Sequence, residues 1–318
     1  MNEIKINEID GFYFGEAEDF SALTGCTVII SEEGAVGGVC VAGGAPATRE
    51  TDLLDPRNTV ERVNAVVLSG GSAFGLDACS GVMDYLEQKQ IGVDMQVTHV
   101  PIVCGASLFD LTVGSPFSRP DKLMGKKACE DAYLHHRLLD GNYGAGCGCS
   151  IGKLLGPEYM MKSGQGSCAY QLGDLKVGAV VCVNAVGNIL ENQDVIAGVL
   201  NPNGKGCLKV EDLLTMKLQK SNGNTTIGCI VTNAKLTKAQ MNKLALIAHD
   251  AYAHCIFPVH TSMDGDSIFA LGSGCVETDL DIASILAVRA MEQAIYRAVK
   301  QAQPIGGLKA YSSLHSSD

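Results

Sequence analysis

The clearest structural signal in the chain is a strand that leads into a helix, and its residues read Thr226-Ile227-Gly228-Cys229-Ile230-Val231-Thr232, a short link, and then Lys238 to Cys255. The first run is almost entirely apolar, which is typical of a strand buried on both faces. The second begins with a capping box, since Gln240 follows Thr237 by three residues, and apolar residues then recur at helical spacing. An apolar strand followed by an amphipathic helix indicates an α/β protein.

The rest of the chain alternates in the same way. We predict further strands at residues 27–31, 36–42, 65–69, 99–103, 177–186 and 268–271, and further helices at residues 73–88, 126–138 and 280–301. The polar stretch 201–224 is predicted to be an exposed loop that runs into the strand at Thr225. No repeat or low-complexity linker divides the chain, so one domain spanning 1–318 is expected.

The composition limits what the protein binds. The 318 residues include 24 Lys and Arg against 35 Asp and Glu, a net charge of −11 with neutral histidines. Without clustered positive charge, binding to nucleic acid or to an anionic membrane surface is not expected. Hydrophobic residues make up 46% of the chain, which allows a large core. No apolar run reaches the roughly 18 residues of a membrane span, and the N-terminus has no apolar signal segment.

The 13 cysteines contain no C-x-x-C pair. In a chain of this size they are expected to be reduced and mostly buried, which favours a cytoplasmic location.

Two glycine-rich stretches are similar to nucleotide-binding loops but lack essential residues. In residues 70–75, Ser72 stands where G-x-G-x-x-G requires its second glycine. A Walker A loop ending at Lys153 fails because Cys147 and Leu154 occupy the positions of its first glycine and its magnesium-binding hydroxyl. Histidines and cysteines show no metal-ligand spacing. We therefore expect neither a cofactor nor a metal.

A possible serine nucleophile lies in residues 148–152, which read Gly148-Cys149-Ser150-Ile151-Gly152 and match G-x-S-x-G. A nucleophile elbow needs a strand directly before it, whereas the residues before Ser150 are rich in glycine. An irregular glycine-rich turn fits this context better, and Ser150 remains the alternative nucleophile.

Two hydroxyls stand where the polar loop becomes the buried strand, at Thr225 and Thr226. They are either ordinary strand-entry threonines or part of an autocatalytic site. In the second case, the Thr225 hydroxyl attacks the carbonyl of Asn224, and an N-to-O acyl shift followed by hydrolysis makes Thr225 a new N-terminal residue. Its α-amine, with an ordinary pKa of about 7.7 to 8.0, then acts as the base for its own hydroxyl.

A pair of carboxylates, Asp264 and Asp266, flanks Gly265 just before an apolar run. They are either solvated turn residues or part of a site, since like charges so close need a cation or hydrogen-bond donors nearby. Lys153 and a freed Thr225 amine are the candidate cations.

Ordered blocks that include these residues run along most of the chain, at residues 43–52, 68–76, 100–103, 141–146, 183–185, 224–226, 248–250 and 264–266. In these blocks the sequence resembles the self-cleaving peptidases that include D-/L-aminopeptidases, β-peptidyl aminopeptidases and nylon-oligomer (6-aminohexanoate oligomer) hydrolases. The resemblance implies a four-layer αββα sandwich, similar in fold to ornithine acetyltransferases. It also implies a precursor that cuts itself into an α chain, 1–224, and a β chain, 225–318, and a homotetramer.

The resemblance also implies residue roles. Thr225 is the nucleophile, and Asn184 is an amide donor that helps hold the oxyanion. Lys153 is a positive group near the nucleophile, and Asp264 and Asp266 orient its amine and hydroxyl. Such a set matches what acyl transfer needs, namely a nucleophile, a base and donors aimed at the developing oxyanion.

Within this family the aminopeptidase branch has a serine nucleophile and a Ser/Glu pair, whereas Thr225 with Asp264 and Asp266 is similar to the nylon-oligomer hydrolases. This favours hydrolysis of short linear amides or peptides, with 6-aminohexanoate oligomers as one substrate. Cys147 and the stretch 104–106 depart from the small residues usual in the family, which affects the pocket.

Two other functions stay open at this point. Acyl transfer to an amine acceptor, as in ornithine acetyltransferases, requires the same cleavage at Asn224-Thr225. A non-enzymatic oligomer that binds an anion at residues 70–75 requires an intact chain.

Overall fold

The computed structural model describes residues 1–203, 206–216 and 223–315. Its main sheet has ten strands, in the order β1-β11-β12-β15-β17-β3-β5-β8-β4 with β2 paired to β3. Their bounds are β1 Asn2–Ile4, β2 Tyr13–Asp19, β3 Thr24–Val41, β4 Thr48–Arg49, β5 Arg62–Ser69, β8 Val103–Ser107, β11 Gln165–Leu172, β12 Leu175–Asn184, β15 Thr225–Ala234 and β17 Ser267–Val276. The four long helices are α1 Ala78–Gln88, α2 Lys122–His135, α4 Lys238–Cys255 and α5 Leu280–Lys300.

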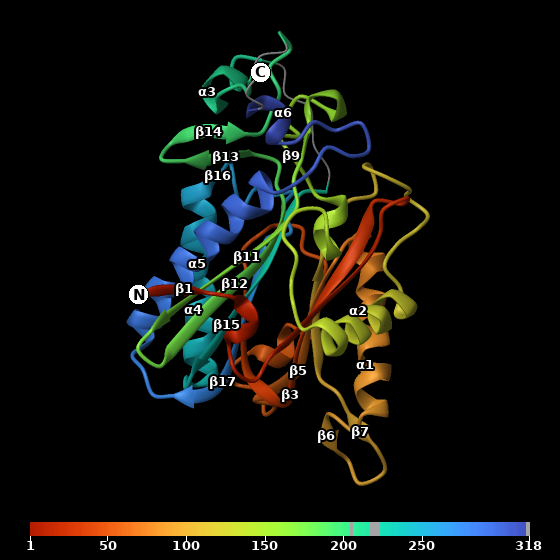
Figure 1. The fold of residues 1–318 in the computed structure, drawn as a ribbon, viewed down its shortest axis with the longest axis vertical. Helices are drawn as coiled ribbons and strands as arrows, with labels where there is room; N and C mark the ends of the chain where they lie inside the picture. The colour runs from red at the N-terminus through yellow and green to blue at the C-terminus, as the bar shows by residue number, and fades with distance from the viewer. Residues whose placement is uncertain (204–205, 217–222, 316–318) are drawn as a thin grey trace.

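The long strand β3 belongs to two layers of this sheet. Its residues 24–30 pair with β2 and its residues 26–30 with β5, whereas its residues 36–41 pair with β17. The register between β3 and β5 shifts between Ile30 and Ala35. The sheet therefore folds over along β3 into two stacked layers, with α4 and α5 outside one layer and α1 and α2 outside the other (Figure 1).

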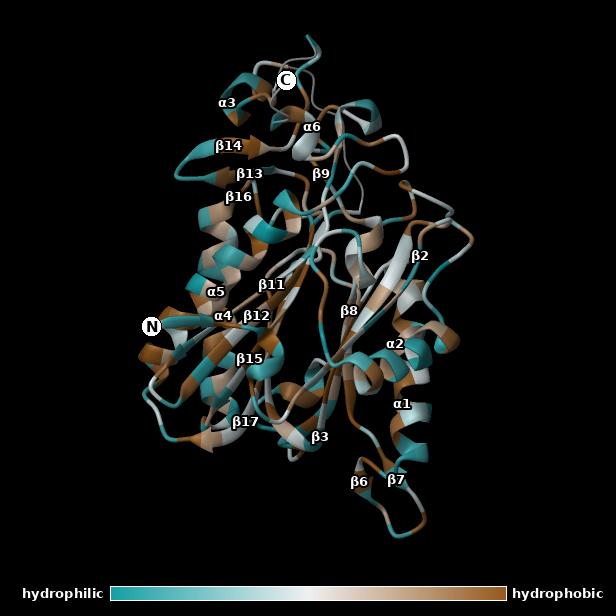
Figure 2. Ribbon diagram, viewed as in Figure 1, coloured by the Kyte–Doolittle hydropathy of each residue, from teal (hydrophilic) through white to brown (hydrophobic). Residues whose placement is uncertain are grey.

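Three apolar cores separate the four layers, and β15 illustrates how alternation builds them. Its residues Ile227, Cys229 and Val231 contribute to the core between the two sheet layers. Ile230 points the other way, into the core shared with α4 and α5. A third core lies between β3, β5 and β8 and the helices α1 and α2. The brown central strands in Figure 2 reflect this two-sided burial. The expected αββα sandwich is confirmed.

Smaller elements complete the chain. They are β6 Val93–Asp94, β7 His99–Val100, β9 Ser150–Ile151, β10 Met161–Lys162, β13 Asn188–Glu191, β14 Asp194–Ala197, β16 Ile256–Phe257, α3 Val210–Leu213 and α6 Ser312–His315, with short 3-10 turns at Ile6–Glu8, Asp52–Leu54, Ser72–Asp77, Gly144–Gly148 and Pro157–Tyr159. Strands β13, β14 and β16 form a small sheet of their own, at the end of the molecule where β15 begins (Figure 1).

Several predicted boundaries need correction. Helix α2 begins at Lys122 rather than at residue 126, because the Asp121 side chain caps it by accepting from the Met124 N–H at 2.9 Å. The predicted strand 99–103 is two strands, β7 and β8, separated at Pro101, which has no N–H to donate. The predicted loop 201–224 contains the helical turn α3. Residues 204–205 and 217–222 of that loop lie outside the described residues.

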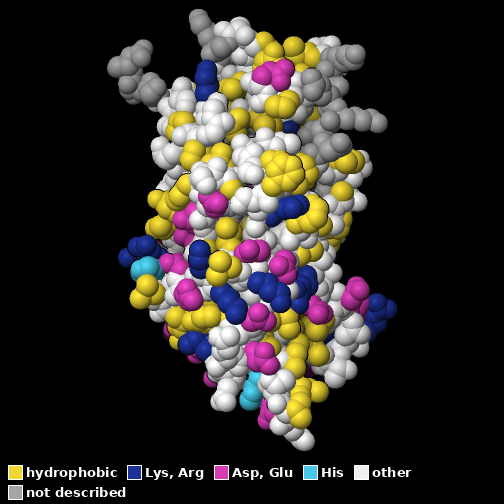
Figure 3. Space-filling view, turned by 90° about the vertical axis from the view of Figure 1, so that its right-hand side faces the viewer, with side chains coloured by type: hydrophobic (Ala, Val, Ile, Leu, Met, Phe, Trp, Pro, Cys, Tyr) yellow, Lys and Arg dark blue, Asp and Glu magenta, His cyan; other side chains and the backbone are white. Residues whose placement is uncertain are grey.

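Two further properties bear on partners. No helix within the described ranges is long and apolar enough to cross a membrane. On the face shown in Figure 3, Lys and Arg side chains lie among Asp and Glu side chains rather than in a patch of their own.

All 13 cysteines are free thiols and ten of them are buried, as predicted.

Candidate active site

The sheet topology brings Thr225 and the acidic pair together. Strands β15 and β17 are parallel neighbours, so both begin at the same edge of the sheet. Asn224 forms a bridge with Asp264 just before these strands. Strand β12 is antiparallel to β15 and ends at this edge, where Asn184 pairs directly with Thr225. Residues about 40 positions apart along the chain thus meet at one buried point.

Thr225 faces the bond that precedes it. By the alternation along β15, its side chain points into the space between the sheet layers, and the residue is only 5% exposed. Its hydroxyl Oγ1 donates to the carbonyl oxygen of Asn224. The same oxygen accepts the backbone N–H of Gly265 at 2.9 Å. A side-chain hydroxyl and a backbone N–H therefore converge on one peptide carbonyl oxygen.

Gly265 is fitted to this position by its missing side chain. A Cβ atom on it would lie 2.9 Å from Thr225 Oγ1 and 3.1 Å from the carbonyl oxygen of Ala45. The turn is also held from outside, because the Ala45 N–H donates to the Asp264 carbonyl at 2.8 Å. Any larger residue would push against the hydroxyl of Thr225.

Lys153 and Asn184 form the opposite side of the site. The Lys153 ammonium donates to the backbone oxygen of Asn184 at 3.0 Å and to its side-chain Oδ1 at 2.8 Å, and it lies 3.5 Å from the Gly223 carbonyl. The Asn184 amide Nδ2 donates to the carbonyl of Phe109 at 2.9 Å. This amide donor is thus engaged away from the Asn224 carbonyl, whereas the Lys153 ammonium lies beside the segment that precedes Thr225.

Burial shapes the charges here. It lowers the pKa of Lys153 to about 8, a change that Cys149, Asp264 and Asp110 counteract. Burial, reinforced by the charge of Asp266, raises the pKa of Asp264 above its ordinary value. The site therefore combines a destabilised ammonium with the Asp264 carboxylate, whose charged form is favoured by Lys153 and by hydrogen bonds to Thr261.

The two carboxylates hold backbone rather than the Thr225 hydroxyl. Asp266 Oδ1 accepts the Thr226 N–H at 2.7 Å, and its Oδ2 accepts the His260 N–H at 3.1 Å and lies 2.8 Å from His260 Nδ1. Asp264 Oδ2 accepts the Thr261 N–H at 2.7 Å. Asp266 thereby fixes Thr226, the residue that follows Thr225, and Asp264 fixes the turn that carries Gly265.

Ser150 has a different environment. It lies in the two-residue strand β9, after the glycine-rich 3-10 turn Gly144–Gly148. Its Oγ is buried and has no hydrogen-bond partner within the described part of the chain. Its backbone N–H donates to Asn184 Oδ1 at 3.1 Å, so it helps to orient Asn184. The elbow-like motif is thus a turn that supports the site from its backbone.

The glycine loop at residues 70–75 is a tight strand-to-helix turn between β5 and α1. The Gly71 N–H donates to Asp110 Oδ1 at 2.7 Å, and Asp110 Oδ2 accepts the Thr24 hydroxyl at 2.7 Å. This loop donor already serves a carboxylate of the chain itself, which argues against the anion-binding alternative.

The five side chains predicted from the sequence lie close together in the structure, but the sequence analysis did not include the groups that hold them. In the sequence analysis, His260 was considered only as a metal ligand. The feature that could have linked it to the site is its position six residues before Asp266. Phe109 and the N–H of Gly265 act through the backbone, so no residue type could have indicated them.

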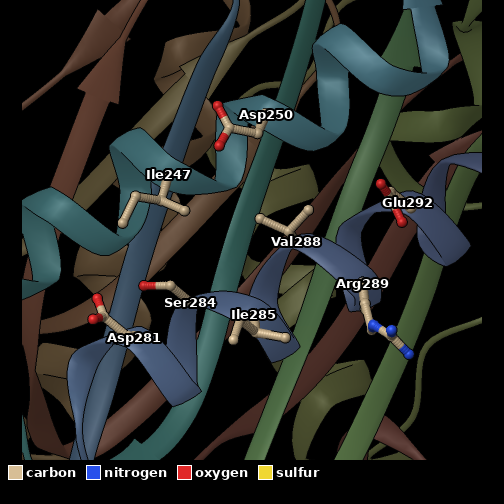
Figure 4. A pocket seen from close by; sticks show the side chains of 8 residues that line it. All are labelled: Ile247, Asp250, Asp281, Ser284, Ile285, Val288, Arg289 and Glu292. Atoms are coloured by element: carbon tan, nitrogen blue, oxygen red, sulfur yellow. The ribbon is translucent and has the colours of Figure 1, made fainter.

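A hollow on the outer surface lies away from this site. It has a volume of about 490 Å³ and runs between α4 and α5, lined by Ile247, Asp250, Asp281, Ser284, Ile285, Val288, Arg289 and Glu292 (Figure 4). Ile285 is 59% exposed there, so the groove opens on the outer face of the helix layer. None of its lining residues belongs to the Thr225 site.

Comparisons with known proteins fit this geometry. The model of peptidase family S58 matches residues 5–312. An uncharacterized aminopeptidase of Mycobacterium tuberculosis is 38% identical over 315 residues, which cover 91% of this chain and 89% of the relative. A 6-aminohexanoate-oligomer endohydrolase of a Kocuria species is 30% identical over 274 residues, which cover 83% of this chain and 73% of that enzyme.

A solved structure confirms the fold. The L-aminopeptidase D-Ala-esterase/amidase of Ochrobactrum anthropi, described as a variant of the Ntn hydrolase fold, superposes with a TM-score of 0.72 at 17% identity, covering 98% of this chain and 92% of its own. Because the family match covers nearly the whole sequence and the layered fold agrees with it, this chain belongs to peptidase family S58, a family of hydrolases.

Proposed function

We propose that the protein is a self-processing amidohydrolase that cuts its own chain between Asn224 and Thr225 and then uses Thr225 as an N-terminal nucleophile. The observation that carries this proposal is the convergence of the Thr225 hydroxyl and the Gly265 N–H on the Asn224 carbonyl oxygen. Two donors on one peptide oxygen polarise that carbonyl, and the hydroxyl that donates to it is also the group that attacks it.

The arrangement supports the following route of self-cleavage. Thr225 Oγ adds to the carbonyl carbon of Asn224, and the oxyanion that forms is held by the Gly265 N–H. The bond from that carbon to the Thr225 nitrogen breaks, and the hydroxyl proton passes to the departing nitrogen. Water then hydrolyses the ester, which leaves a carboxylate on Asn224 and an α-amine on Thr225. The catalytic domain becomes two chains, 1–224 and 225–318.

Turnover of a substrate uses the same hydroxyl with a new base. The freed α-amine takes the Thr225 proton as Oγ attacks the substrate amide, and it returns the proton to the leaving amine. Lys153 and the Asn184 amide stabilise the oxyanion, the latter after its release from Phe109. Asp264 and Asp266 hold the segments around the new N-terminus, and water resolves the acyl-enzyme.

The proposed substrates are short linear amides and peptides, with 6-aminohexanoate oligomers among them. Support comes from the 6-aminohexanoate-oligomer endohydrolase relative and from the aminopeptidase relatives. A cytoplasmic location and a homotetramer complete the proposal, and light scattering of the purified protein tests the tetramer. Linear 6-aminohexanoate oligomers and α-peptides, each assayed with and without an added amine acceptor, test the substrate class. Product formation that requires the acceptor would replace hydrolysis by acyl transfer.

Intact mass spectrometry of the freshly purified protein tests the nucleophile. We expect fragments of 224 and 94 residues, about 23.5 and 10 kDa if mass follows length. Thr225→Ala should stay a single chain of 33.4 kDa without amidase activity. Ser150→Ala is the matched control, since it removes another buried hydroxyl beside Asn184, and it should be cut and active. An uncut but active wild type would favour Ser150 as the nucleophile instead of Thr225.

A further inference from the structure

Four buried polar atoms lie behind the site, between β15 and α4. They are Thr226 Oγ1, His249 Nδ1, Tyr252 Oη and His260 Nε2, and none has a hydrogen-bond partner among the residues that the structure describes. Leaving a buried polar group without a partner destabilises the folded chain. Four such atoms in a well-packed core point to a shared ligand.

The side chains that carry the four atoms form one cluster. The ring of His249 lies with its centroid 4.8 Å from that of His260 and 5.2 Å from that of Tyr252. Tyr252 also faces β15, because its hydroxyl would lie only 2.8 Å from a Cβ atom on Gly228. Thr226 lies on the same face of β15 as Gly228, and Asp266 joins it to His260 by accepting from both.

The hydrogen bonds outside the cluster fix which of these atoms accept. His260 Nδ1 lies 2.8 Å from the Asp266 carboxylate and must donate, so Nε2 of the neutral ring presents a lone pair. His249 Nε2 lies 3.1 Å from the Cys40 carbonyl and must donate, so its Nδ1 also presents a lone pair. Burial lowers the pKa of His249 to about 4, which keeps this ring neutral.

The hydroxyls of Tyr252 and Thr226 supply the complementary groups. Each has a proton to donate, and burial raises the pKa of Tyr252 well above its ordinary value, so the phenol stays protonated. The cluster therefore offers two acceptors and two donors. A water molecule has two protons to give and two lone pairs to fill, and buried waters typically make about three hydrogen bonds to groups of this kind.

We propose that Thr226, His249, Tyr252 and His260 bind one internal water molecule. The water donates to the two ring nitrogens and accepts from the two hydroxyls. It holds His260 in the tautomer that donates to Asp266, which makes His260 a positioning residue for the carboxylate that fixes Thr226 beside the nucleophile. This effect on catalysis rests on the proposed function, whereas the water and the tautomers do not.

The first test observes the water and the tautomers directly. The full-length protein, labelled with 15N-histidine, is studied by NMR through the couplings between ring nitrogens and ring protons, with His249→Phe to assign the signals. We expect His260 to carry its proton on Nδ1 and His249 on Nε2 at neutral pH. A high-resolution crystal structure should show a water within hydrogen-bond distance of at least three of the four atoms. A His260 ring protonated on Nε2, or a site without water, would overturn the proposal.

The second test measures positioning. Tyr252→Phe and Thr226→Val each remove one hydroxyl, and both should slow self-cleavage about 3- to 10-fold, the effect of losing one hydrogen bond. Thr226→Ser restores the hydroxyl and should restore the rate. Tyr296→Phe makes the same change as Tyr252→Phe on α5 and should leave the rate unaltered. Unchanged rates of self-cleavage in both Tyr252→Phe and Thr226→Val would mean that His260 does not position the Asp266 carboxylate. An uncut wild type would instead refute self-cleavage and leave the first test standing.

Discussion

Thr225 and Ser150 are both buried hydroxyls beside Asn184, but their surroundings differ. Around Thr225, the Asn224 carbonyl accepts the hydroxyl and the Gly265 N–H, and the Asp266 carboxylate anchors the next residue. Around Ser150, the hydroxyl has no hydrogen-bond partner among the described residues, and the backbone N–H orients Asn184. The difference teaches that a nucleophile is defined by the carbonyl and the donors it faces, whereas the G-x-S-x-G motif describes only a local turn.

Each region also has a buried lysine, and replacing them gives the largest expected contrast. Lys153 contacts Asn184, and its replacement in Lys153→Met should lower amidase kcat/KM by about 100- to 1000-fold, the effect of losing one oxyanion donor. The assay is turnover of a linear amide by chain that has already been cut, so that processing and turnover are measured separately.

Lys162 is the matched control for Lys153. It is equally buried, and its ammonium donates to the carbonyls of Gly146 and Cys149, both at 3.0 Å, and of Ser163. Lys162→Met should destabilise the fold, because each carbonyl left without a donor costs about 1 to 3 kcal/mol, while the folded fraction keeps its turnover. Urea unfolding measures the loss. Equal losses of turnover in both variants would mean that Lys153, too, is only structural.

The carboxylates sharpen the same contrast with a smaller effect. In Asp266→Asn, an amide replaces a carboxylate that accepts three hydrogen bonds. The amide nitrogen carries hydrogens of its own, so it repels the N–H of Thr226 or of His260 that it faces. We expect self-cleavage to slow about 10- to 100-fold, in line with the loss of one or two charge-assisted hydrogen bonds at about 1.5 to 3 kcal/mol each. Timed mass spectra after synthesis of the chain give the rate.

Asp110 is the corresponding carboxylate on the Ser150 side, packed against Gly148. It accepts from the Thr24 hydroxyl and the Gly71 N–H, and an asparagine can keep one of these bonds. Asp110→Asn should therefore be cut at nearly the wild-type rate. If it slows cleavage as much as Asp266→Asn does, charge in the whole buried region matters rather than contact with Thr226.

How far the sequence predicts the fold depends on the element. Helix α4 has the predicted bounds, because Thr237 and Gln240 form the capping box at its start. Strand β11 was missed because Gln165, Tyr170 and Gln171 interrupt its apolar pattern, and it is defined instead by its pairing with β12.

The site divides along similar lines. The side chains of Thr225, Asp264 and Asp266 could be named from the sequence, since residue type carries their chemistry. The direction of the Asn184 amide could not, because it depends on the Phe109 carbonyl, which a distant segment brings to it. The Gly265 N–H is likewise a property of the backbone path, and glycine is read first as a turn residue.

The smallest expected effect concerns stability at high pH, where the Ser150 region contains groups that act in opposite directions. Burial raises the pKa of Cys149 to about 12 and lowers the pKa of Lys162 to about 8. The buried thiol favours the folded chain fully below pH 9, and this contribution is lost as pH rises from 9 to 12, because the unfolded thiol ionises first. Burying the Lys162 ammonium disfavours the folded chain below pH 8, and this cost is relieved as pH rises from 8 to 10.5.

Single variants separate the two contributions. Cys149→Ala should flatten the fall of the unfolding free energy above pH 9 by at most about 1.4 kcal/mol per pH unit, the limit for one proton. Lys162→Met should remove the opposing gain, so that the decline becomes steeper between pH 8 and 10.5. Urea unfolding of the Thr225→Ala background at several pH values measures both slopes in a chain that stays whole. If Lys153→Met changes the slope as Lys162→Met does, both ammonium groups are buried at the same cost, and only the contact of Lys153 with Asn184 distinguishes the Thr225 region from the Ser150 region.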